Sequence, residues 1–329
     1  MDVLILGSTS NICAIRVFDN LNNLHHKINN IYCYDMVKMN NDGFINYVKT
    51  NVTISQPCQI YNKINYIYGQ FNVDYYECLI KPLIHKKLII YVAVPPFCYK
   101  DIAIFFYKYN YFYHSLILEK PLSLNYINYK ALQPHLLNNT YVMDHFLYKK
   151  DIQKIIKKYK DTDINFFKIS FLYQCDVEDR LRYFDNVGFF IDMFQSHYLS
   201  ILYCIIGNKI YNLINADIVK IIKKQYHKYG GKNKVDTYFY IELKYDNNIY
   251  IFEGGKAMRN EIKSITVNNE KIEIKGYNNE YELFFNDLMD SNAMNLISQH
   301  DVFWQITDNI NKNFKTNNLK LSFYYKNKL

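Results

Sequence analysis

The 329-residue sequence lacks an apolar run long enough to cross a membrane. Its longest apolar segment, Tyr198–Ile206, is interrupted by Ser200, whereas a spanning helix needs about 18 or more such residues. The first ten residues, MDVLILGSTS, carry neither the basic region nor the cleavage motif of a signal peptide. We therefore expect a soluble, cytoplasmic protein without a membrane partner.

Cysteine motifs and a concentrated basic block are also missing. The seven cysteines form no CxxC pair and no cluster with histidine, so we expect reduced thiols and no metal site. The formal net charge is +8, but the lysines are scattered in short pairs such as Lys149–Lys150 and Lys223–Lys224. This scatter disfavours a nucleic-acid site, and a basic field equally suits small phosphorylated ligands.

The residues that are present indicate two globular domains. Half of the residues are hydrophobic and 21% are charged, a balance typical of folded proteins, and the length suffices for two cores. All six prolines lie within the first 134 residues, so the character of the chain changes soon afterwards. We place the boundary near residue 140, between a domain of residues 1–140 and a domain of residues 141–329.

The first domain is predicted to be a doubly wound α/β domain with a Rossmann-like parallel sheet. Short, wholly apolar runs are typical of strands buried on both faces. The segments between them are long enough for crossover helices. The runs are Val3–Leu6, Ile31–Tyr34, Leu88–Val94 and Leu116–Leu118.

The second domain is predicted to be an α+β substrate domain with a mixed or antiparallel sheet. Phe166–Tyr173 indicates a strand and Asn186–Ile206 a long helix. The alternating residues from 235 to 267 indicate an antiparallel meander, and the turn at 268–270 a hairpin that extends it. Helices are expected at Tyr281–Met289 and Asp301–Ile310.

Several candidate ligand-binding segments follow the predicted strands of the first domain. Gly7–Ile12 joins the first strand to a helix, where backbone N–H groups can receive a phosphate. Val94-Pro95-Pro96 and Glu119-Lys120-Pro121 end later strands, and residues past the carboxyl ends of parallel strands line ligand crevices. A stiff turn and a solvated lysine would explain these last two segments equally well.

Further polar clusters lie in the second half of the sequence. Asp144–Lys149 combines an acid, an imidazole and an ammonium, although Asp144 would also serve as an ordinary helix cap. On an α-helix Asp192 shares a face with Gln195 and Ser196, while His197 falls on an apolar stripe, where a core role is the simpler interpretation. Gly254-Gly255-Lys256 ends a strand, as a tight turn or as a phosphate or hydroxyl contact.

Taken in order, these segments resemble the signature series of the glucose-6-phosphate dehydrogenase family. The resemblance spans almost the whole chain. It includes Gly7–Ile12, Tyr66–Phe71, Val92–Pro96, Glu119–Leu122, Asp144–Lys149, Arg182–Gly188, Asp192–His197, Gly255–Met258, Tyr281-Glu282, Trp304 and Asp308–Ile310.

The resemblance implies a hydride transfer from C1 of an aldose phosphate to a nicotinamide dinucleotide, giving the lactone. It makes His197 the general base, oriented by Asp144. It assigns the sugar phosphate to His145 and Lys149, and sugar hydroxyls to Asp192 and Lys256, with Lys120 bridging substrate and cofactor. The implied cofactor positions are Gly7, Ser8, Thr9, Ser10, Asn11, Ile12, Asp35, Tyr66, Pro95 and Lys120.

Cofactor choice follows from the end of the second predicted strand. Asp35 would accept hydrogen bonds from ribose hydroxyls, and Met36 stands where NADP-using members carry an arginine, so NAD is favoured over NADP. The alternative interpretation is that Asp35 only caps the following turn.

Three positions depart from the family pattern. Ser10 replaces its second glycine, Phe146 replaces a tyrosine, and Leu172–Cys175 replaces a segment that holds a substrate-binding carboxylate. These losses leave open a catalytically degenerate paralogue that acts as a binding or scaffold subunit. A dehydrogenase of an unphosphorylated sugar is a third reading. The chain is shorter than typical members in the sheet that forms the family's dimer interface, so a homodimer is only one expectation.

Overall fold

The computed structural model describes residues 1–52, 54, 58–177, 180–226, 230–275, 279–316 and 322–324. It divides into two compact units, each built from separate stretches of sequence. The first comprises Met1–Ser123, Ile127–Tyr148 and Asn278–Ser298, and the second comprises Leu124–Tyr126, Lys149–Tyr277 and Gln299–Leu329. The sequence predicts a single boundary near residue 140. It does not predict that residues 278–298 belong to the first unit.

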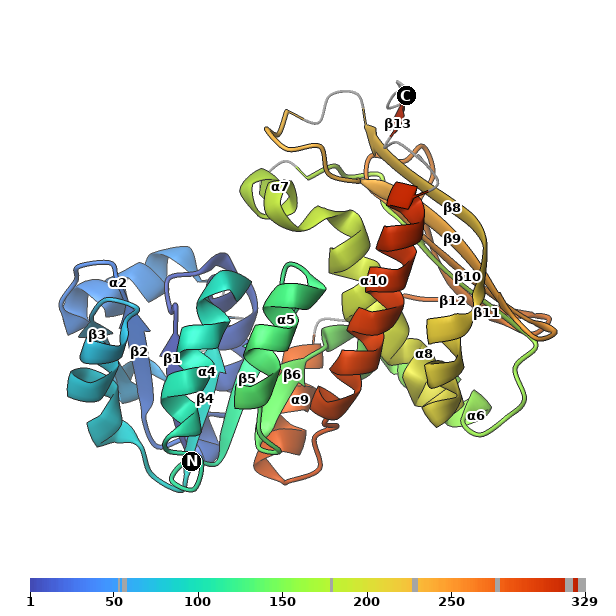
Figure 1. The fold of residues 1–329 in the computed structure, drawn as a ribbon. Coiled ribbons are helices and arrows are strands. Elements are labelled where there is room, and N and C mark those ends of the chain that lie inside the picture. Colours follow the sequence, from blue (N-terminus) through green and yellow to red (C-terminus); the bar gives the residue numbers. More distant parts are fainter. Residues whose placement is uncertain are drawn as a thin grey trace. The chain divides into compact units, whose positions relative to one another are not determined.

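The first unit contains a six-stranded, wholly parallel sheet in the order β3-β2-β1-β4-β5-β6 (Figure 1). Every residue of the central strands β1 and β4 is buried, as expected for strands covered on both faces. The predicted parallel α/β domain is therefore confirmed. The strands are β1 (Asp2–Leu6), β2 (Ile31–Asp35), β3 (Ile64–Tyr68), β4 (Leu88–Val92), β5 (Ser115–Glu119) and β6 (Thr140–Met143).

Sequence patterning missed the two edge strands, β3 and β6. In β3 only the first residue is buried, and in β6 Tyr141 is partly exposed. Neither segment has the wholly apolar pattern of the central strands. Helices connect the strands: η1 (Cys13–Val17), α1 (Phe18–Asn23), α2 (Asn41–Asn51), α3 (Val73–Tyr75), η4 (Tyr76–Ile80), α4 (Tyr99–Tyr107) and α5 (Tyr126–Leu132). Short 3₁₀ turns are η2 (His25–Lys27), η3 (Tyr61–Lys63), η5 (Lys81–Leu83), η6 (Pro96–Cys98), η7 (Gln133–His135), η8 (His145–Tyr148) and η12 (Ile297–Gln299).

Helix α9 (Glu280–Met289) completes the first unit although it follows the second sheet in sequence. It packs beside α1, where Asn23 Nδ2 donates to Glu282 Oε2 at 2.8 Å and Lys27 Nζ lies 2.9 Å from Asp290 Oδ1. Its Tyr281 hydroxyl reaches the sheet and donates to Glu119 Oε1 at 3.0 Å.

Glu119 is the acidic centre of a tyrosine cluster at the end of β5. The Tyr91 and Tyr281 hydroxyls both donate to its Oε1, and the Tyr99 hydroxyl donates to its backbone oxygen at 3.1 Å. Burial raises the pKa of the Glu119 carboxyl to about 7, against the opposing effect of the two hydroxyl donors. The cluster joins β4, β5 and α9, and it immediately precedes Lys120 in the chain.

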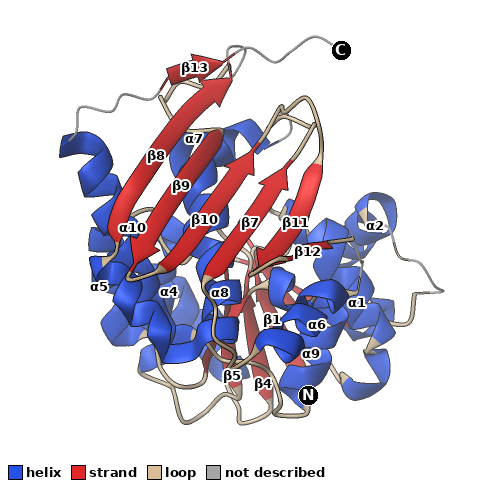
Figure 2. Cartoon of the chain, turned by 90° about the vertical axis from the view of Figure 1, so that its right-hand side faces the viewer, coloured by secondary structure: helices blue, strands red, loops and turns tan. Residues whose placement is uncertain are grey.

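The second unit contains a seven-stranded mixed sheet in the order β12-β11-β7-β10-β9-β8-β13. Figure 2 shows these strands in front of helices α7, α8 and α10. The alternation predicted for β9 is confirmed, since Phe239, Ile241 and Leu243 are buried while their neighbours are partly exposed. The strands are β7 (Phe166–Leu172), β8 (Asp217–Tyr226), β9 (Tyr238–Tyr245), β10 (Asn248–Gly255), β11 (Ile262–Val267), β12 (Glu270–Glu273) and β13 (Ser322–Tyr324).

The predicted meander is wrong in one connection. β8, β9 and β10 do run antiparallel in sequence order, but β7 lies between β10 and β11. It pairs parallel with β10 and antiparallel with β11. The alternation of the residues identified the strands, but it carries no information on which neighbour each strand chooses. The β11–β12 hairpin is as predicted.

A long helical stretch packs against this sheet. It runs through α7 (Leu181–Phe190), the π-helical η10 (Ile191–Tyr198), α8 (Leu199–Ile206) and the 3₁₀ segment η11 (Gly207–Asn215). By length and mean hydropathy, with its polar residues included, this is the one stretch among the described residues that could cross a membrane, which the search for an uninterrupted apolar run did not identify. In it 83% of the apolar window is buried inside the protein. Such burial is that of a core helix. The other helices of the unit are α6 (Lys150–Tyr159) and α10 (His300–Thr316).

The long helix breaks at Gly188, which has φ of +72°, a backbone conformation that glycine adopts at little cost. Asp236 stabilises the restart. Its Oδ2 accepts the Phe190 N–H at 2.5 Å, and its backbone oxygen accepts the Phe189 N–H at 2.9 Å. The Lys223 ammonium lies 3.7 Å from the Phe190 ring centroid, and burial lowers its pKa to about 8. Asp236 therefore acts as the cap of the helix that continues to His197.

We predict that Asp236→Ala lowers the free energy of unfolding by about 1–2 kcal/mol, the usual loss on removing a helix cap. Asp236→Asn keeps an oxygen acceptor for the Phe190 N–H. Burial raises the pKa of Asp236, so ionising it in the fold is costly, and the neutral amide should match or exceed the parent at neutral pH. Urea unfolding measures all three proteins. Equal losses for Asn and Ala would show that the negative charge beside Lys223 matters more than the cap.

A second prediction concerns pH. Because the folded pKa of Glu119 is raised to about 7, its contribution to stability is complete below the unfolded value and is lost as pH rises through about 7. Glu119→Gln should therefore flatten the fall in unfolding free energy between about pH 5 and about pH 8. Glu242→Gln, which alters a carboxyl that accepts from the Tyr240 hydroxyl, is the control and should keep the parent's slope. An unchanged slope in Glu119→Gln would contradict the assignment.

Candidate functional site

The turn after β1 requires glycine for two reasons. Gly7 has φ of +86°, and a Cβ there would lie 2.8 Å from Val94 Cγ1 and 2.9 Å from the Ala93 oxygen. Both contacts come from the segment after β4. The Gly7 and Ser8 amides donate to the Tyr34 oxygen at 2.9 and 3.3 Å. Gly7 therefore lets the segments after β1, β2 and β4 meet at one edge of the sheet.

The helix that follows begins with two backbone amides of the kind that can receive an anion. Ser10, in place of the family's second glycine, caps this helix, since its Oγ accepts the Cys13 N–H at 3.4 Å. The amides of Asn11 and Ile12 have no acceptor among the described residues, and the buried Ser8 hydroxyl has no partner there either. An unpartnered buried hydroxyl beside two unpartnered amides fits a phosphate-bearing cofactor. The serine side chain at position 10 thus compensates for a missing glycine without consuming these two donors.

Thr9 does not present its amide in the same way. Its N–H and its hydroxyl both donate to Asp35 Oδ2, at 2.8 and 2.9 Å. The Met36 N–H donates to Asp35 Oδ1 at 2.7 Å, so Asp35 also caps the turn after β2. Both interpretations of Asp35 from the sequence therefore have a structural counterpart, and its side chain is held between the two turns.

Tyr66 lies near this edge. Its hydroxyl donates to the Val37 oxygen, and its ring stacks on Phe44 with centroids 4.4 Å apart. Pro95 follows β4 and begins the turn η6, where its oxygen accepts the Cys98 N–H at 3.0 Å. The structure thus places Pro95 after β4, as the sequence predicts, and Tyr66 within β3, a strand that the sequence did not predict.

Lys120 and Asp144 form a buried ion pair in the first unit. Lys120 Nζ lies 2.6 Å from Asp144 Oδ2, and each side chain is 3% exposed. Asp144 Oδ1 accepts the Phe146 N–H at 3.1 Å, so Asp144 also caps the turn that contains His145. The His145 ring stacks on Tyr281, with centroids 6.2 Å apart. The ends of β5 and β6 thereby bring together an ammonium, a carboxylate and an imidazole.

The helix that carries His197 is π-helical from Ile191 to Tyr198. The Ser196 hydroxyl donates to the Ile191 oxygen, five residues earlier, at 3.0 Å. In a π-helix the backbone hydrogen bonds join residues five apart, so Asp192 and His197 project closer to one direction than they would on an α-helix. The faces assigned from the period of an α-helix therefore do not carry over unchanged to this segment.

The second unit holds four of the predicted site residues. His197 is buried, and Asp192 Oδ1 accepts the Tyr183 hydroxyl at 2.5 Å. Lys256 Nζ lies 4.4 Å from the centroid of the Tyr173 ring and 3.5 Å from Cys175 Sγ. Lys149 precedes α6, where its oxygen accepts the Gln153 N–H at 2.9 Å.

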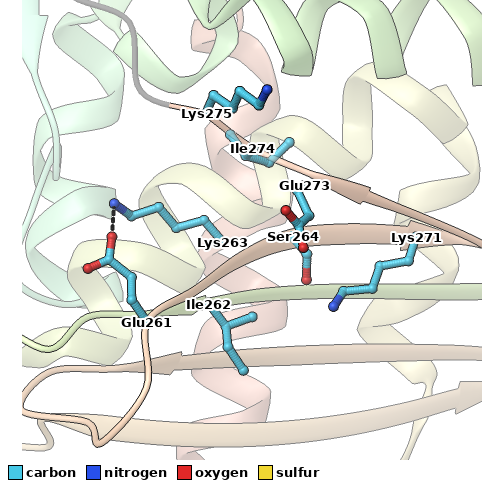
Figure 3. A pocket seen from close by; sticks show the side chains of 8 residues that line it. All are labelled: Glu261, Ile262, Lys263, Ser264, Lys271, Glu273, Ile274 and Lys275. Carbon is cyan, nitrogen blue, oxygen red and sulfur yellow. Dashed lines mark ion pairs between the residues drawn. The ribbon is translucent and has the colours of Figure 1, made fainter.

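Two other features of the second unit lie apart from these residues. The β11–β12 hairpin carries a hollow of about 240 Å³ lined by lysines, glutamates and isoleucines, where Lys263 pairs with Glu261 (Figure 3). Its lining contains none of the predicted site residues. Across the described part of the chain, no group of three or more His, Cys, Asp or Glu side chains is arranged to hold a metal ion.

Sequence reasoning missed the tyrosines that hydrogen-bond to the acidic side chains at or beside the predicted site residues. Tyr183 holds Asp192, and Tyr91 and Tyr281 hold Glu119, next to Lys120. These tyrosines are three among 34 in the sequence, so composition could not single them out. Thr9 was identified, but as a phosphate contact, and only the register of β1 with β2 places it against Asp35.

Comparison with known proteins identifies relatives of both units. Residues 4–154 match the family model described as the NAD binding domain of glucose-6-phosphate dehydrogenase. The chain is 24% identical over 233 residues to glucose-6-phosphate 1-dehydrogenase of Borreliella burgdorferi. The match covers 61% of this chain and 48% of the relative, so the chain matches about half of that enzyme's length.

Solved structures share the fold of the whole chain. A glucose-6-phosphate dehydrogenase in complex with glucose 6-phosphate superposes with a TM-score of 0.77 at 16% identity. The glucose-6-phosphate 1-dehydrogenase of Mycobacterium avium gives 0.76 at 13% identity. In each case the alignment covers 99% of this chain and 94% of the solved one. At these identities the likeness establishes the fold, namely a parallel-sheet domain with a mixed-sheet domain. Together with the match over residues 4–154, it shows that the first unit is similar to the NAD binding domain of glucose-6-phosphate dehydrogenase and that the whole chain shares the fold of such enzymes.

Proposed function

We propose that the protein is a nicotinamide-dinucleotide-dependent dehydrogenase that oxidises C1 of an aldose phosphate to the lactone, with glucose 6-phosphate as the first candidate substrate. The observation that carries the proposal is the π-helical segment Ile191–Tyr198, in which Asp192 and His197, five residues apart, project closer to one direction than they would on an α-helix. A general base and a hydroxyl-binding carboxylate can then address the same sugar ring. The match of residues 4–154 to the NAD binding domain of glucose-6-phosphate dehydrogenase and the unpartnered amides of Asn11 and Ile12 support the proposal.

The first unit would hold the cofactor through the turn after β1. The Asn11 and Ile12 amides would receive the pyrophosphate, with the Ser8 hydroxyl beside them. Gly7 keeps this turn against Ala93 and Val94. A bound nicotinamide dinucleotide supplies the acceptor for the two electrons that leave C1. The side chains of the protein then have to bind the sugar and accept one proton.

His197 would accept the proton of the C1 hydroxyl. An imidazole is the side chain whose ordinary pKa suits proton transfer near neutral pH. Asp192 would accept a hydrogen bond from a sugar hydroxyl, and the Tyr183 hydroxyl fixes its orientation at 2.5 Å. The role of Asp144 in orienting His197 stays a prediction. Inside its own unit Asp144 is paired with Lys120, which compensates its buried charge.

The phosphate would be bound by His145 and Lys149. Phe146 is buried and supplies no hydroxyl, so these two side chains would make the contact without the tyrosine usual in the family. Lys256 would contact a sugar hydroxyl while its ammonium rests over the Tyr173 ring. Tyr173 lies in the segment that replaces the family's substrate-binding carboxylate, so we infer that the sugar-hydroxyl contacts differ there.

We also infer that NAD is preferred to NADP. Asp35 is a buried carboxylate at the end of β2, and a 2′-phosphate placed beside it would meet a like charge. Met36 is half exposed and offers no positive charge to compensate. The soluble, cytoplasmic setting and a homodimer, which the sequence suggested, stay predictions. No observation in the described part of the chain favours the scaffold alternative.

The first test of this function is dinucleotide reduction, followed at the nicotinamide absorbance, with a panel of phosphorylated and free aldoses. The parent should reduce the cofactor with a phosphorylated aldose and far less with the free sugar. His197→Asn should lower kcat by about 10²–10⁴-fold, the usual share of a general base, while dinucleotide binding persists. Gln153→Ala, on α6, is a folding control. A parent that is inactive with the whole panel, or a His197→Asn variant within a few-fold of it, would refute the proposal.

The second test concerns the cofactor. The parent should show a kcat/KM at least about tenfold higher with NAD than with NADP, because like-charge repulsion and the lack of a cationic partner each cost about 1–2 kcal/mol. Met36→Arg should raise kcat/KM for NADP by about tenfold and leave the value for NAD nearly unchanged. Met36→Gln adds a polar side chain without charge and should not do so. A parent that already uses NADP better would overturn the preference and leave the family assignment intact.

A further inference from the structure

We propose that Thr9 is a specificity-determining residue that acts through Asp35. It holds the Asp35 carboxylate so that one oxygen faces the turn after β1 and the other remains for a ribose hydroxyl. The inference rests on the proposed function, because it concerns the choice between the two nicotinamide dinucleotides. It gives Thr9 a role other than the phosphate contact that the sequence suggests.

The parallel register of β1 with β2 brings the two residues together. Leu6 pairs with Tyr34, and the Gly7 and Ser8 amides then bond to the Tyr34 oxygen. Thr9 is thereby carried over the end of β2, where Asp35 is the last residue of the strand. The Tyr47 hydroxyl from α2 donates to the Thr9 oxygen at 3.1 Å and holds the turn from a third side.

The Asp35 carboxylate can accept one hydrogen bond more than it receives from the protein. A carboxylate accepts about four hydrogen bonds, two at each oxygen. Oδ2 receives two from Thr9, at 2.8 and 2.9 Å, and Oδ1 receives one from the Met36 N–H at 2.7 Å. One position therefore remains on Oδ1. That is enough for a single ribose hydroxyl, which can donate, and it offers nothing to a 2′-phosphate, which cannot.

The burial of Asp35 makes this arrangement consequential. Asp35 is 6% exposed, so solvent stabilises its negative charge only weakly. Hydrogen-bond donors of the protein must therefore stabilise that charge. Of the three donors, two are backbone N–H groups that no side-chain change removes. The Thr9 hydroxyl is the one donor that a substitution can delete, and valine deletes it with little change in volume.

The contact between Thr9 and Asp35 also determines which backbone amides are left to donate hydrogen bonds to a phosphate. The Thr9 N–H is turned to Asp35 and the Ser10 N–H to the Gly7 oxygen at 3.1 Å. Recognition of the anion is left to Asn11 and Ile12. The turn thus separates two tasks: its first half holds the carboxylate that discriminates the ribose, and its second half faces the pyrophosphate.

The experiment measures the dissociation constants of NADH and NADPH by calorimetry, with no substrate present. Thr9→Val should weaken NADH binding by about three- to tenfold and NADPH binding little, so that the preference falls, because a charge-assisted bond that fixes Asp35 is lost. Thr9→Ser keeps the hydroxyl and should stay within about twofold of the parent. Thr9→Ala serves in place of valine if the valine variant does not fold.

The matched control is Thr50→Val. The Thr50 hydroxyl is exposed on α2 and donates to the Asn46 and Tyr47 oxygens of its own helix. This substitution makes the same chemical change away from Asp35 and should leave both constants unchanged. In a background of Asp35→Asn, Thr9→Val should produce no further change in the ratio of the two constants, since the side chain it positions has lost its charge.

The outcomes separate the two hypotheses. A folded parent that binds neither dinucleotide overturns the proposed function and this inference with it. Binding of NADH with an unchanged ratio in Thr9→Val overturns the role of Thr9 alone. An equal loss for both cofactors in Thr9→Val also overturns it, because that result would assign Thr9 to the phosphates that the two cofactors share.

Discussion

The close approach of the segments after β1 and β4 at Gly7 is the constraint on which the first unit's candidate site depends. A side chain at position 7 would overlap Ala93 and Val94 at distances below 3 Å. With glycine there, the chain can leave β1 in a left-handed conformation and place Thr9 against Asp35. The first two amides of the helix that starts at Asn11 take no part in the hydrogen bonds of the sheet. The absence of a Cβ at Gly7 is therefore required both for the path of the turn after β1 and for the contact of Thr9 with Asp35.

The second unit depends on a comparable irregularity in a helix. Gly188 interrupts the helix, and Asp236 caps its restart through the Phe190 N–H. The helix then continues with π-helical hydrogen bonds, which cost some regularity and are common at functional sites. Buried charges accompany this segment, since Lys223 lies against Phe190 and donates to Asn311 Oδ1 at 2.6 Å. The polar groups that a buried helix start would leave unpaired are thus supplied with partners.

The departures from the family pattern are compensated locally in different ways. Ser10 loses the freedom of glycine and gains a helix cap. Tyr173 lacks the charge of a carboxylate and gives its aromatic face to the Lys256 ammonium. Phe146 is buried and supplies packing in place of a hydroxyl. A chain altered at these positions keeps satisfied contacts around Lys120, Asp144 and Asp192.

The sequence by itself determined the strands of the first sheet's centre, the alternating strands of the second sheet and the segments that carry polar residues. It could do so because wholly apolar runs and alternation report burial on both faces or on one. The edge strand β3 was missed because most of its residues are not buried, and β6 was missed because it is only four residues long and begins with a polar threonine. The period of an α-helix also does not describe the segment from Ile191 to Tyr198, whose backbone hydrogen bonds are π-helical.

Tertiary structure alone decided the remaining relations. The insertion of β7 between β10 and β11 and the return of α9 to the first unit depend on pairings between residues far apart in sequence. The contacts of Thr9 with Asp35, of Tyr281 with Glu119 and of Lys120 with Asp144 have the same origin. The residue types in the sequence were enough to identify the candidate site side chains. Their orientation came from strand register and from burial, which force every buried charge to find a donor or acceptor wherever the fold supplies one.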